Sequence, residues 1–317
     1  MKYVIGVDLG GTFIKSAIFT QDGEIVVQSS VDTGDDHRPE VVVKRIADAV
    51  NANINEKNIN KSHISGLGIG SPGPLNSKTG IVKFSPNIKG WRDVPLRDLL
   101  EKETGIKTKL YNDANAAAYG EFWKGAGKDV STFVMFTLGT GIGGGLILNN
   151  KLYTGIDDYA GELGHMTVLP DGPLCGCGNY GCIEALASAT AVVRRTIEGI
   201  EKGRETILKK DLAEGTLTCK AVYNAAVAGD KYAIEILAET GRYLGIVASW
   251  MVNALNPEMI VYSGGLSKAG PYLFDHIISE AKKRSLAAPF ERVKICPAQL
   301  GYDAGLIGAA GLLLAED

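Results

Sequence analysis

A strand that runs into a glycine- and threonine-rich turn, and then into a second strand, occurs twice in this 317-residue chain. The first copy is Asp8-Leu9-Gly10-Gly11-Thr12 and the second is Thr137-Leu138-Gly139-Thr140-Gly141. Glycine lets backbone N–H groups approach phosphate oxygens, because it tolerates unusual φ angles and has no Cβ atom. One such turn is most often only a hairpin, but a further strand, Ile260–Ser263, also runs into Gly264-Gly265. The repeat therefore predicts two α/β units that face each other across a phosphate-binding cleft.

Apolar spacing and turn residues predict the elements around these turns. In chain order we expect strands at 3–7, 14–19 and 24–28, a helix at 39–53, a strand at 64–69, a helix at 94–104 that Gly105 ends, strands at 107–111, 132–138 and 144–148, mainly helices over 188–252, a strand at 260–263 and a helix at 305–314. We expect a smaller N-terminal α/β domain, residues 1–113 plus about 303–317. We expect residues 114–302 to form the larger, C-terminal α/β domain.

Composition and charge exclude several classes of protein. Hydrophobic residues make up 45% and charged residues 22%, so apolar burial can offset chain entropy. The formal net charge is −3 and the lysines are scattered, which argues against nucleic acid or a membrane as a partner. No signal-like segment precedes the first strand, and the longest apolar stretch, about Tyr243 to Leu255, is shorter than the roughly 20 residues of a spanning helix. We therefore expect a cytoplasmic protein.

Three of the five cysteines, Cys175, Cys177 and Cys182, lie within eight residues. An odd number of cysteines in a large chain without a signal segment favours metal binding or catalysis over disulfides. Together with His165 the three thiols form a set that is typical of tetrahedral Zn²⁺, and the intervening glycines let the backbone fold around an ion. Because all four ligands come from the protein, the predicted zinc is structural. The alternative is a chance cluster of buried thiols.

From the residues alone, Asp8 has one functional interpretation, and four other charged side chains have two each. Asp8 stands where a carboxylate could hold Mg²⁺, and Lys15 either reaches a phosphate or is an ordinary exposed lysine. Asp113 follows a strand and starts an alanine-rich helix, so it is either a general base or a helix N-cap. Glu162 and Glu184 are either held in place by the zinc loop or are solvated glutamates.

Several segments together resemble a known family, in order and over essentially the whole chain. They are Asp8–Thr12, Asn112–Asn115, Leu138–Gly145, Gly161–His165 and Cys175–Glu184, and they resemble the ROK family of sugar kinases and repressors. The resemblance implies an α/β fold of the actin-like (ribonuclease H-like) two-domain sugar kinase class, with a cleft between the domains. Pro86–Trp91 and Gly120–Gly127 are most similar to the bacterial and archaeal glucokinases of that family.

The resemblance also implies roles for single residues. Asp113 is similar to the catalytic base, and five residues are similar to those that hydrogen-bond the sugar hydroxyls: Asn87, Asn112, Glu162, His165 and Glu184. ATP with Mg²⁺ would be held by Asp8, Gly10, Gly11, Thr12, Lys15, Gly139, Thr140 and Gly141, with Gly264 and Gly265 near the adenosine. Members of the family are commonly dimers or tetramers.

Two departures from the family pattern bear on specificity. Asn76 stands where the family often has Asp, which we expect to alter a surface turn. Asp157-Asp158-Tyr159 stands where small residues are common, and Tyr159 could touch the sugar pocket.

The implied activity is transfer of the γ-phosphoryl group of ATP to the 6-hydroxyl of a hexose, with glucose first. Mannose, fructose, N-acetylglucosamine and N-acetylmannosamine are alternatives, because fold analogy does not rank them. A ROK transcriptional repressor is a second alternative, although the first strand at Tyr3 leaves no residues for an N-terminal helix-turn-helix. An actin-like assembly or chaperone ATPase is a third, and it would not explain the cysteine cluster.

Overall fold

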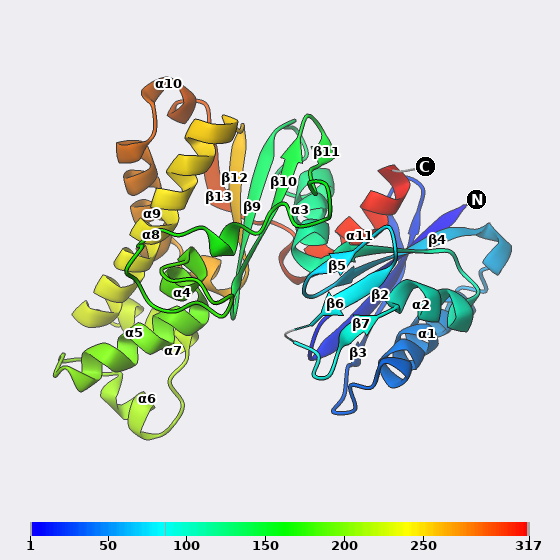
Figure 1. Cartoon of the computed structure of the whole chain (residues 1–317), viewed down its shortest axis with the longest axis horizontal. Coiled ribbons are helices and arrows are strands. Elements are labelled where there is room, and N and C mark those ends of the chain that lie inside the picture. Colours follow the sequence, from blue (N-terminus) through cyan, green and yellow to red (C-terminus); the bar gives the residue numbers. More distant parts are fainter. Residues whose placement is uncertain (1, 86, 316–317) are drawn as a thin grey trace.

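The computed structural model describes residues 2–85 and 87–315, which form two lobes lying side by side (Figure 1). The first strand, β1 (Tyr3–Leu9), and the last helix, α11 (Ala304–Ala315), pack in one lobe, which we call the N-terminal lobe. Met1, Pro86 of the Pro86–Trp91 motif, and the last two residues of the predicted 303–317 segment lie outside the described residues.

Each lobe is built on a five-stranded sheet, and the two sheets have the same topology. In the N-terminal lobe the order is β3 (Ile25–Asp32), β2 (Phe13–Thr20), β1, β4 (Ile64–Ser71) and β8 (Thr108–Asn112). In the C-terminal lobe it is β11 (Lys151–Leu152), β10 (Ile142–Leu148), β9 (Phe133–Leu138), β12 (Met259–Ser263) and β13 (Lys294–Pro297). Three antiparallel strands are followed by two parallel ones in both sheets. This duplication confirms the predicted repeat and the actin-like fold.

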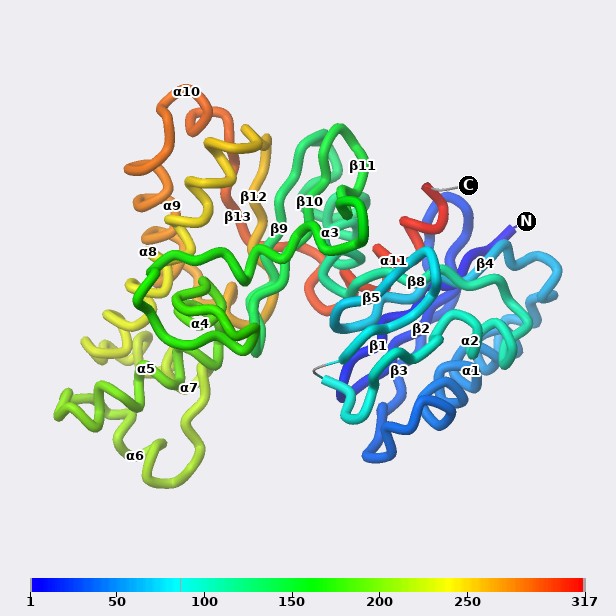
Figure 2. The backbone as a smooth tube through the Cα atoms, viewed as in Figure 1, coloured from blue at the N-terminus to red at the C-terminus, as the bar shows by residue number. Residues whose placement is uncertain are grey.

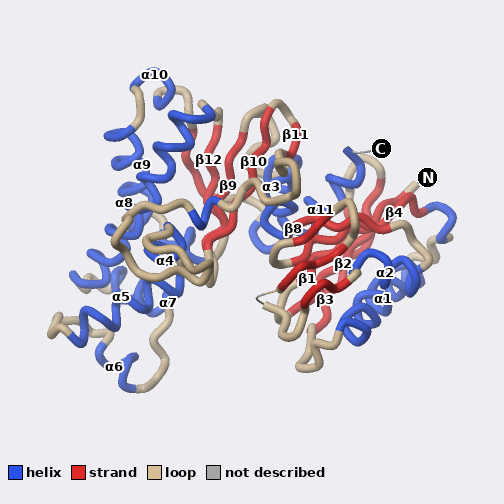
Figure 3. The backbone as a smooth tube through the Cα atoms, in the orientation of Figure 1, coloured by secondary structure: helices blue, strands red, loops and turns tan. Residues whose placement is uncertain are grey.

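Helices cover the sheets on their outer sides (Figure 3). The N-terminal lobe has α1 (Pro39–Glu56) and α2 (Leu96–Thr104), and a small sheet of β5 (Leu75–Asn76), β6 (Ile81–Phe84) and β7 (Arg92–Val94). The C-terminal lobe has α4 (Ile183–Ala187), α5 (Ala189–Glu201), α6 (Lys209–Ala213), α7 (Cys219–Val227), α8 (Lys231–Leu255), α9 (Pro271–Arg284) and α10 (Ala287–Phe290). Short 3₁₀ turns are η1 (Lys61–His63), η2 (Leu163–His165), η3 (Gly265–Ala269) and η4 (Gly301–Asp303).

Two helices, α3 (Asp113–Lys124) and α11, lie between the lobes and cross in close contact (Figure 2). A Cβ added at Gly308 would lie 1.6 Å from the carbonyl oxygen of Ala116, and one at Gly120 would lie 2.1 Å from that of Ala304. Only glycine allows backbones to approach this closely. α3 shares one hydrophobic core with α11 and with the C-terminal sheet, so this helix contacts both lobes. The domain boundary between residues 113 and 114 therefore stays a prediction.

The buried carboxylate of Glu121, on α3, binds both segments that join the lobes. It accepts hydrogen bonds from the backbone N–H of Ala126 at 3.0 Å, from that of Gln299 at 3.0 Å and from that of Leu300 at 2.6 Å. Ala126 lies where the chain enters the C-terminal sheet, and Gln299 and Leu300 lie where it returns to α11. One side chain therefore fixes both crossings.

The predicted strands and helices are confirmed in kind and order, with shifted ends. The predicted helix at 94–104 starts too early, because Val94 belongs to β7 and Pro95 precedes the first helical residue. Gly105 ends that helix with a φ of 71°, as predicted. The small sheet, β11 and β13 were not predicted. Within residues 2–85 and 87–315, no helix is long and apolar enough to cross a bilayer.

Candidate active site

Asp8 and Asp113 lie at the same edge of the N-terminal sheet, one strand apart. Asp8 pairs with Gly70 of β4, the strand between β1 and β8, and Asn112, which precedes Asp113, pairs with Ser71 of the same strand. Because β1, β4 and β8 run parallel, their carboxyl ends meet here, which is where ligands bind in open sheets of this kind.

Asp113 has the electrostatics of a general base. Burial raises the pKa of its carboxyl to about 7, and the negative charge of Asp8 adds to the shift. The cap of α3 is Asn112, whose Oδ1 accepts from the N–H groups of Ala114 at 3.0 Å and Asn115 at 3.1 Å. Asp113 also accepts from Ala114 at 2.8 Å but is the first residue inside the helix. The helix therefore does not depend on Asp113 for its cap.

Asn112 is predicted to bind the sugar, and its cap restricts how it can do so. The side-chain oxygen is used by the helix, while the amide nitrogen points toward the carbonyl of Gly73 at 3.5 Å. The amide N–H group is thus the part of Asn112 that remains available to a ligand.

Lys15 is a partly buried ion-pair partner and not a freely exposed lysine. Its Nζ lies 2.8 Å from Oδ1 of Asp303 and donates to the carbonyl of Tyr302 at 2.6 Å. Burial raises the pKa of Asp8 to about 6, and the charge of Lys15 opposes that rise. The predicted contact of Lys15 with phosphate stays a prediction.

The first glycine turn lies directly against the segment that carries Asn87. Gly10 N–H donates to the carbonyl of Phe13 at 2.9 Å, and a Cβ added at Gly11 would lie 2.7 Å from the carbonyl oxygen of Asn87. Buried Trp91 anchors that segment, because its Nε1 donates to the carbonyl of His37 at 2.7 Å. The predicted sugar contact and the predicted phosphate turn are therefore neighbours.

The second glycine turn is attached to the start of α5. Ala189 N–H donates to the carbonyl of Gly139 at 2.9 Å, and the hydroxyl of Thr190 donates to the carbonyl of Thr140 at 2.8 Å. Gly264, with a φ of 92°, packs on the end of β9, where an added Cβ would lie 2.3 Å from the carbonyl oxygen of Leu138. The N–H of Gly139 donates to the carbonyl of Gly141 at 3.0 Å, which closes the turn. The turn therefore lies beside a helix N-terminus, which favours anions.

A cavity of about 520 Å³ opens beside this second turn. Its wall includes Thr140 and several side chains of α5 and the start of α7: Thr190, Val193, Arg194, Ile197, Thr218 and Cys219. The predicted adenosine residues, Gly264 and Gly265, do not line it.

The four predicted zinc ligands converge. The ligand atoms of His165, Cys175, Cys177 and Cys182 all lie within 4.8 Å of one another. The sulfur atoms of Cys177 and Cys182 are 3.7 Å apart, and Nδ1 of His165 is 3.7 Å from the sulfur of Cys175. Tetrahedral zinc with bonds of about 2.3 Å to sulfur requires sulfur atoms about 3.8 Å apart. The donor set and its spacing therefore fit Zn²⁺.

The two predicted glutamates, Glu162 and Glu184, each lie beside one of the predicted zinc ligands. Oε2 of Glu162 lies 3.8 Å from Nε2 of His165, so the ring nitrogen that faces away from the cysteines faces this carboxylate. Oε2 of Glu184 accepts from the N–H of Ile142 at 2.9 Å, and its Oε1 lies 3.5 Å from the sulfur of Cys175. Glu184 therefore connects the cysteine cluster with the second glycine turn, a contact that the sequence did not reveal.

The structure also shows the surroundings of Asn76 and of the Asp157–Tyr159 segment, the two departures from the family pattern. The side chain of Asn76 accepts from the N–H of Thr79 at 2.8 Å and so closes a turn. Asp158 accepts from the N–H and hydroxyl of Ser77, both at 2.8 Å, and this contact joins the two lobes. Tyr159 beside it is 49% exposed.

Comparison with known proteins is decisive for the family, since residues 4–316 match the ROK family model. The chain belongs to the ROK family. It is 40% identical to a glucokinase of Halalkalibacterium halodurans over 318 residues, covering 100% of this chain and 96% of that one. The structure of a ROK hexokinase from Thermus thermophilus matches with a TM-score of 0.86 and 32% identity over 99% of this chain and 100% of that one. A ROK glucokinase from Streptomyces griseus, in complex with glucose and AMPPNP, matches with a TM-score of 0.77 and 34% identity over 98% of both chains.

Proposed function

We propose that this ROK protein is an ATP-dependent glucokinase, which transfers the γ-phosphoryl group of ATP to the 6-hydroxyl of glucose. The observation that carries the proposal is Asp113, a carboxylate with a pKa of about 7 at the cleft edge of the sheet, whose helix is capped by its neighbour Asn112. The names of several relatives, which are glucokinases, support glucose as the sugar.

In the proposed reaction Asp113 accepts the proton of the 6-hydroxyl as the oxygen attacks the γ-phosphorus. The new O–P bond forms while the bond from the γ-phosphorus to the bridging oxygen breaks, and ADP leaves. Asn87, the amide of Asn112, Glu162, His165 and Glu184 would hold the other hydroxyls. This positioning provides much of the rate enhancement, because the reacting oxygen is held in line with the phosphate.

On the nucleotide side, the N–H groups of the turns at Gly10-Gly11-Thr12 and Gly139-Thr140-Gly141 would bind the phosphates. Asp8 would hold Mg²⁺, which neutralises charge on the phosphate oxygens when bound. Gly264 and Gly265 would lie near the adenosine, and Lys15 would act through the charge it places beside Asp8.

The proposal includes one structural Zn²⁺ at His165, Cys175, Cys177 and Cys182. With Nδ1 directed to the cysteine cluster, Nε2 of His165 is oriented toward Glu162, and both side chains would then face the sugar. Coordination of one ring nitrogen fixes the orientation of the other. The proposal also includes lobes at 1–113 with 303–317 and at 114–302, a homo-oligomer and a cytoplasmic location.

A panel of sugars with ATP tests the proposal. Glucose is expected to give the highest kcat/KM among glucose, mannose, fructose, N-acetylglucosamine and N-acetylmannosamine, and ATP hydrolysis without sugar is expected to be slow. Another hexose that is better by tenfold, about 1.4 kcal/mol, would reject glucose as the substrate. Rapid hydrolysis that no sugar changes would favour an ATPase, and sugar-dependent DNA binding without transfer would favour a repressor.

A further inference from the structure

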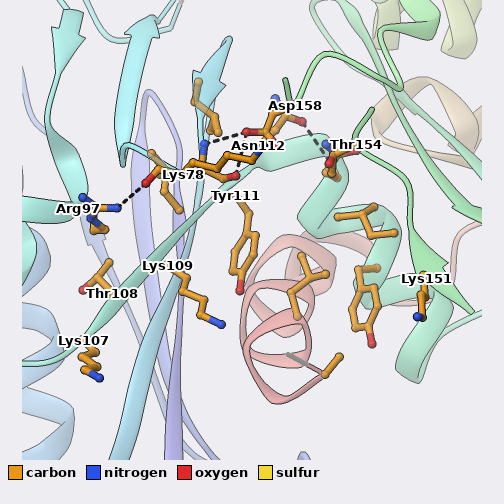
Figure 4. Close-up of a pocket in the computed structure, with 18 of the residues that line it drawn as sticks. Lys78, Arg97, Lys107, Thr108, Lys109, Tyr111, Asn112, Lys151, Thr154 and Asp158 are labelled. Atoms are coloured by element: carbon orange, nitrogen blue, oxygen red, sulfur yellow. Dashed lines mark hydrogen bonds between the residues drawn. The ribbon is translucent and has the colours of Figure 1, made fainter. Parts of the chain in front are cut away.

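A second cavity, of about 1030 Å³, lies where the two sheets have their free edges (Figure 4). Its wall contains every residue of β8, the edge strand of the N-terminal sheet, and both residues of β11, the edge strand of the C-terminal sheet. Residues of α3 and α11, the helices between the lobes, complete it. The cavity is therefore lined by both lobes and by the elements that join them.

The described part of this wall is cationic, although the whole chain carries a net charge of −3. Five basic side chains line it: Lys78, Arg97, Lys107, Lys109 and Lys151. The two acidic ones, Glu101 and Asp158, are each engaged by the wall itself. Glu101 accepts from the N–H of Thr108 at 2.8 Å, and Asp158 accepts from Ser77.

Three of the lysines have side chains that no described residue pairs with. These are Lys78 and Lys107 on the N-terminal lobe and Lys151 on the C-terminal lobe. Arg97 differs, because it donates to the carbonyl of Lys78 at 3.0 Å and to Asp98 at 2.9 Å. Figure 4 shows Lys107 on one side of the cavity and Lys151 on the opposite side. A ligand that meets both must therefore carry negative charge at more than one point.

This cavity is separate from the candidate active site. Of the residues predicted to bind sugar or nucleotide, Asn112 alone lines it, and neither glycine turn nor any zinc ligand does. Leu75, Leu110 and Leu152 give the wall apolar surface between the charges, as in pockets for small molecules.

We propose that the cavity between β8 and β11 is a second binding site, which takes a small anion with two or more phosphate groups. The anion contacts Lys107 on one lobe and Lys151 on the other and so bridges them. Lysine binds phosphate as a mobile point charge, which suits a cavity wider than a single phosphate group.

The test is calorimetric titration of the whole protein with inorganic tripolyphosphate, while glucose and a non-hydrolysable ATP analogue fill the active site and free Mg²⁺ is held constant. We expect about one tripolyphosphate per chain, binding that weakens as salt is raised, and weaker binding of inorganic phosphate. Absence of binding under these conditions refutes the proposal.

Single variants locate the site. Lys107→Ala and Lys151→Ala are each expected to weaken tripolyphosphate binding about threefold, and the double variant about tenfold. The matched control is Lys128→Ala with Lys202→Ala, two exposed lysines outside the cavity, which should leave binding unchanged. If either single variant binds like the unchanged protein, bridging is refuted, and if the control weakens binding equally, the site is refuted.

Two further comparisons separate binding at this cavity from an effect of the chain terminus and from the proposed kinase activity. Glu316 and Asp317 follow Ala315, which lines the cavity, so the titration is repeated after both are changed to Gln; retained binding supports the site, and lost binding overturns it. The measurement does not depend on phosphoryl transfer. A protein that fails to phosphorylate any sugar, yet binds tripolyphosphate through these lysines, would refute the proposed function and leave this site in place.

Discussion

The pH dependence of turnover tests whether Asp113 is the general base. With a pKa of about 7, about 9% of the carboxyl is ionised at pH 6 and about 91% at pH 8. The base must be ionised to accept the proton of the sugar, so kcat/KM should rise about tenfold between these values. An aspartate at the ordinary pKa of 3.8 would be fully ionised throughout, and the profile would be flat.

The variant Asp113→Asn removes the base and keeps the size of the side chain. Because Asn112 caps α3, folding should be nearly unchanged, while kcat should fall roughly 10²- to 10⁴-fold and the rise between pH 6 and 8 should disappear. The assay is ADP release with saturating glucose, beside glucose binding by calorimetry, which should be largely kept. Asp230→Asn, at the N-cap of α8, is the matched control with normal turnover. A flat profile in the unchanged protein, or near-normal turnover in Asp113→Asn, would refute the reasoning.

Three further predictions concern metal and stability. Cys177→Ala should lower the zinc content from about one ion per chain, measured by metal analysis, and should raise the KM for sugar. If the purified, unchanged protein holds no metal and still has a normal KM for sugar, the zinc role is contradicted. Glu121→Gln places an amide N–H against backbone N–H donors and should cost about 2–3 kcal/mol in denaturant unfolding, with exposed Glu291→Gln as a neutral control. Gly308→Ala forces a methyl against the carbonyl of Ala116 and should cost about 1–3 kcal/mol or more; a cost under about 0.5 kcal/mol would show that α3 and α11 separate easily.

The fold could be predicted from the sequence where signals are local. Each of the two glycine turns follows an apolar strand, and the two copies are alike within a few residues, so the duplication is visible without structure. The short strands were not visible, because they form through pairing and not through their own residues. β5 has two residues, Leu75 and Asn76, and exists because they pair with Val82 and Ile81 of β6.

The residues of the candidate site likewise divide into those with a local sequence signal and those whose contacts come from distant segments. Three cysteines within eight residues predict a metal set by spacing alone. By contrast, the sequence could not decide between base and cap for Asp113, because the answer depends on which side chain reaches the N–H of Asn115. The partner of Lys15 is Asp303, 288 residues away. Such contacts depend on how distant segments meet, which no local pattern reports.

Glu184 changes what loss of zinc should do. The family resemblance suggests that the metal acts first on the sugar side, since it implies sugar contacts for His165, Glu162 and Glu184. In the structure, however, Glu184 also holds the N–H of Ile142, the residue directly after the Gly139-Thr140-Gly141 turn. A Cβ at Gly141 would lie 2.3 Å from Oε2 of Glu184, so turn and carboxylate fit each other closely. If loss of the proposed zinc loosens the cysteine loop, Glu184 moves and the second glycine turn loses a support. Zinc removal should therefore raise the KM for ATP as well as that for sugar.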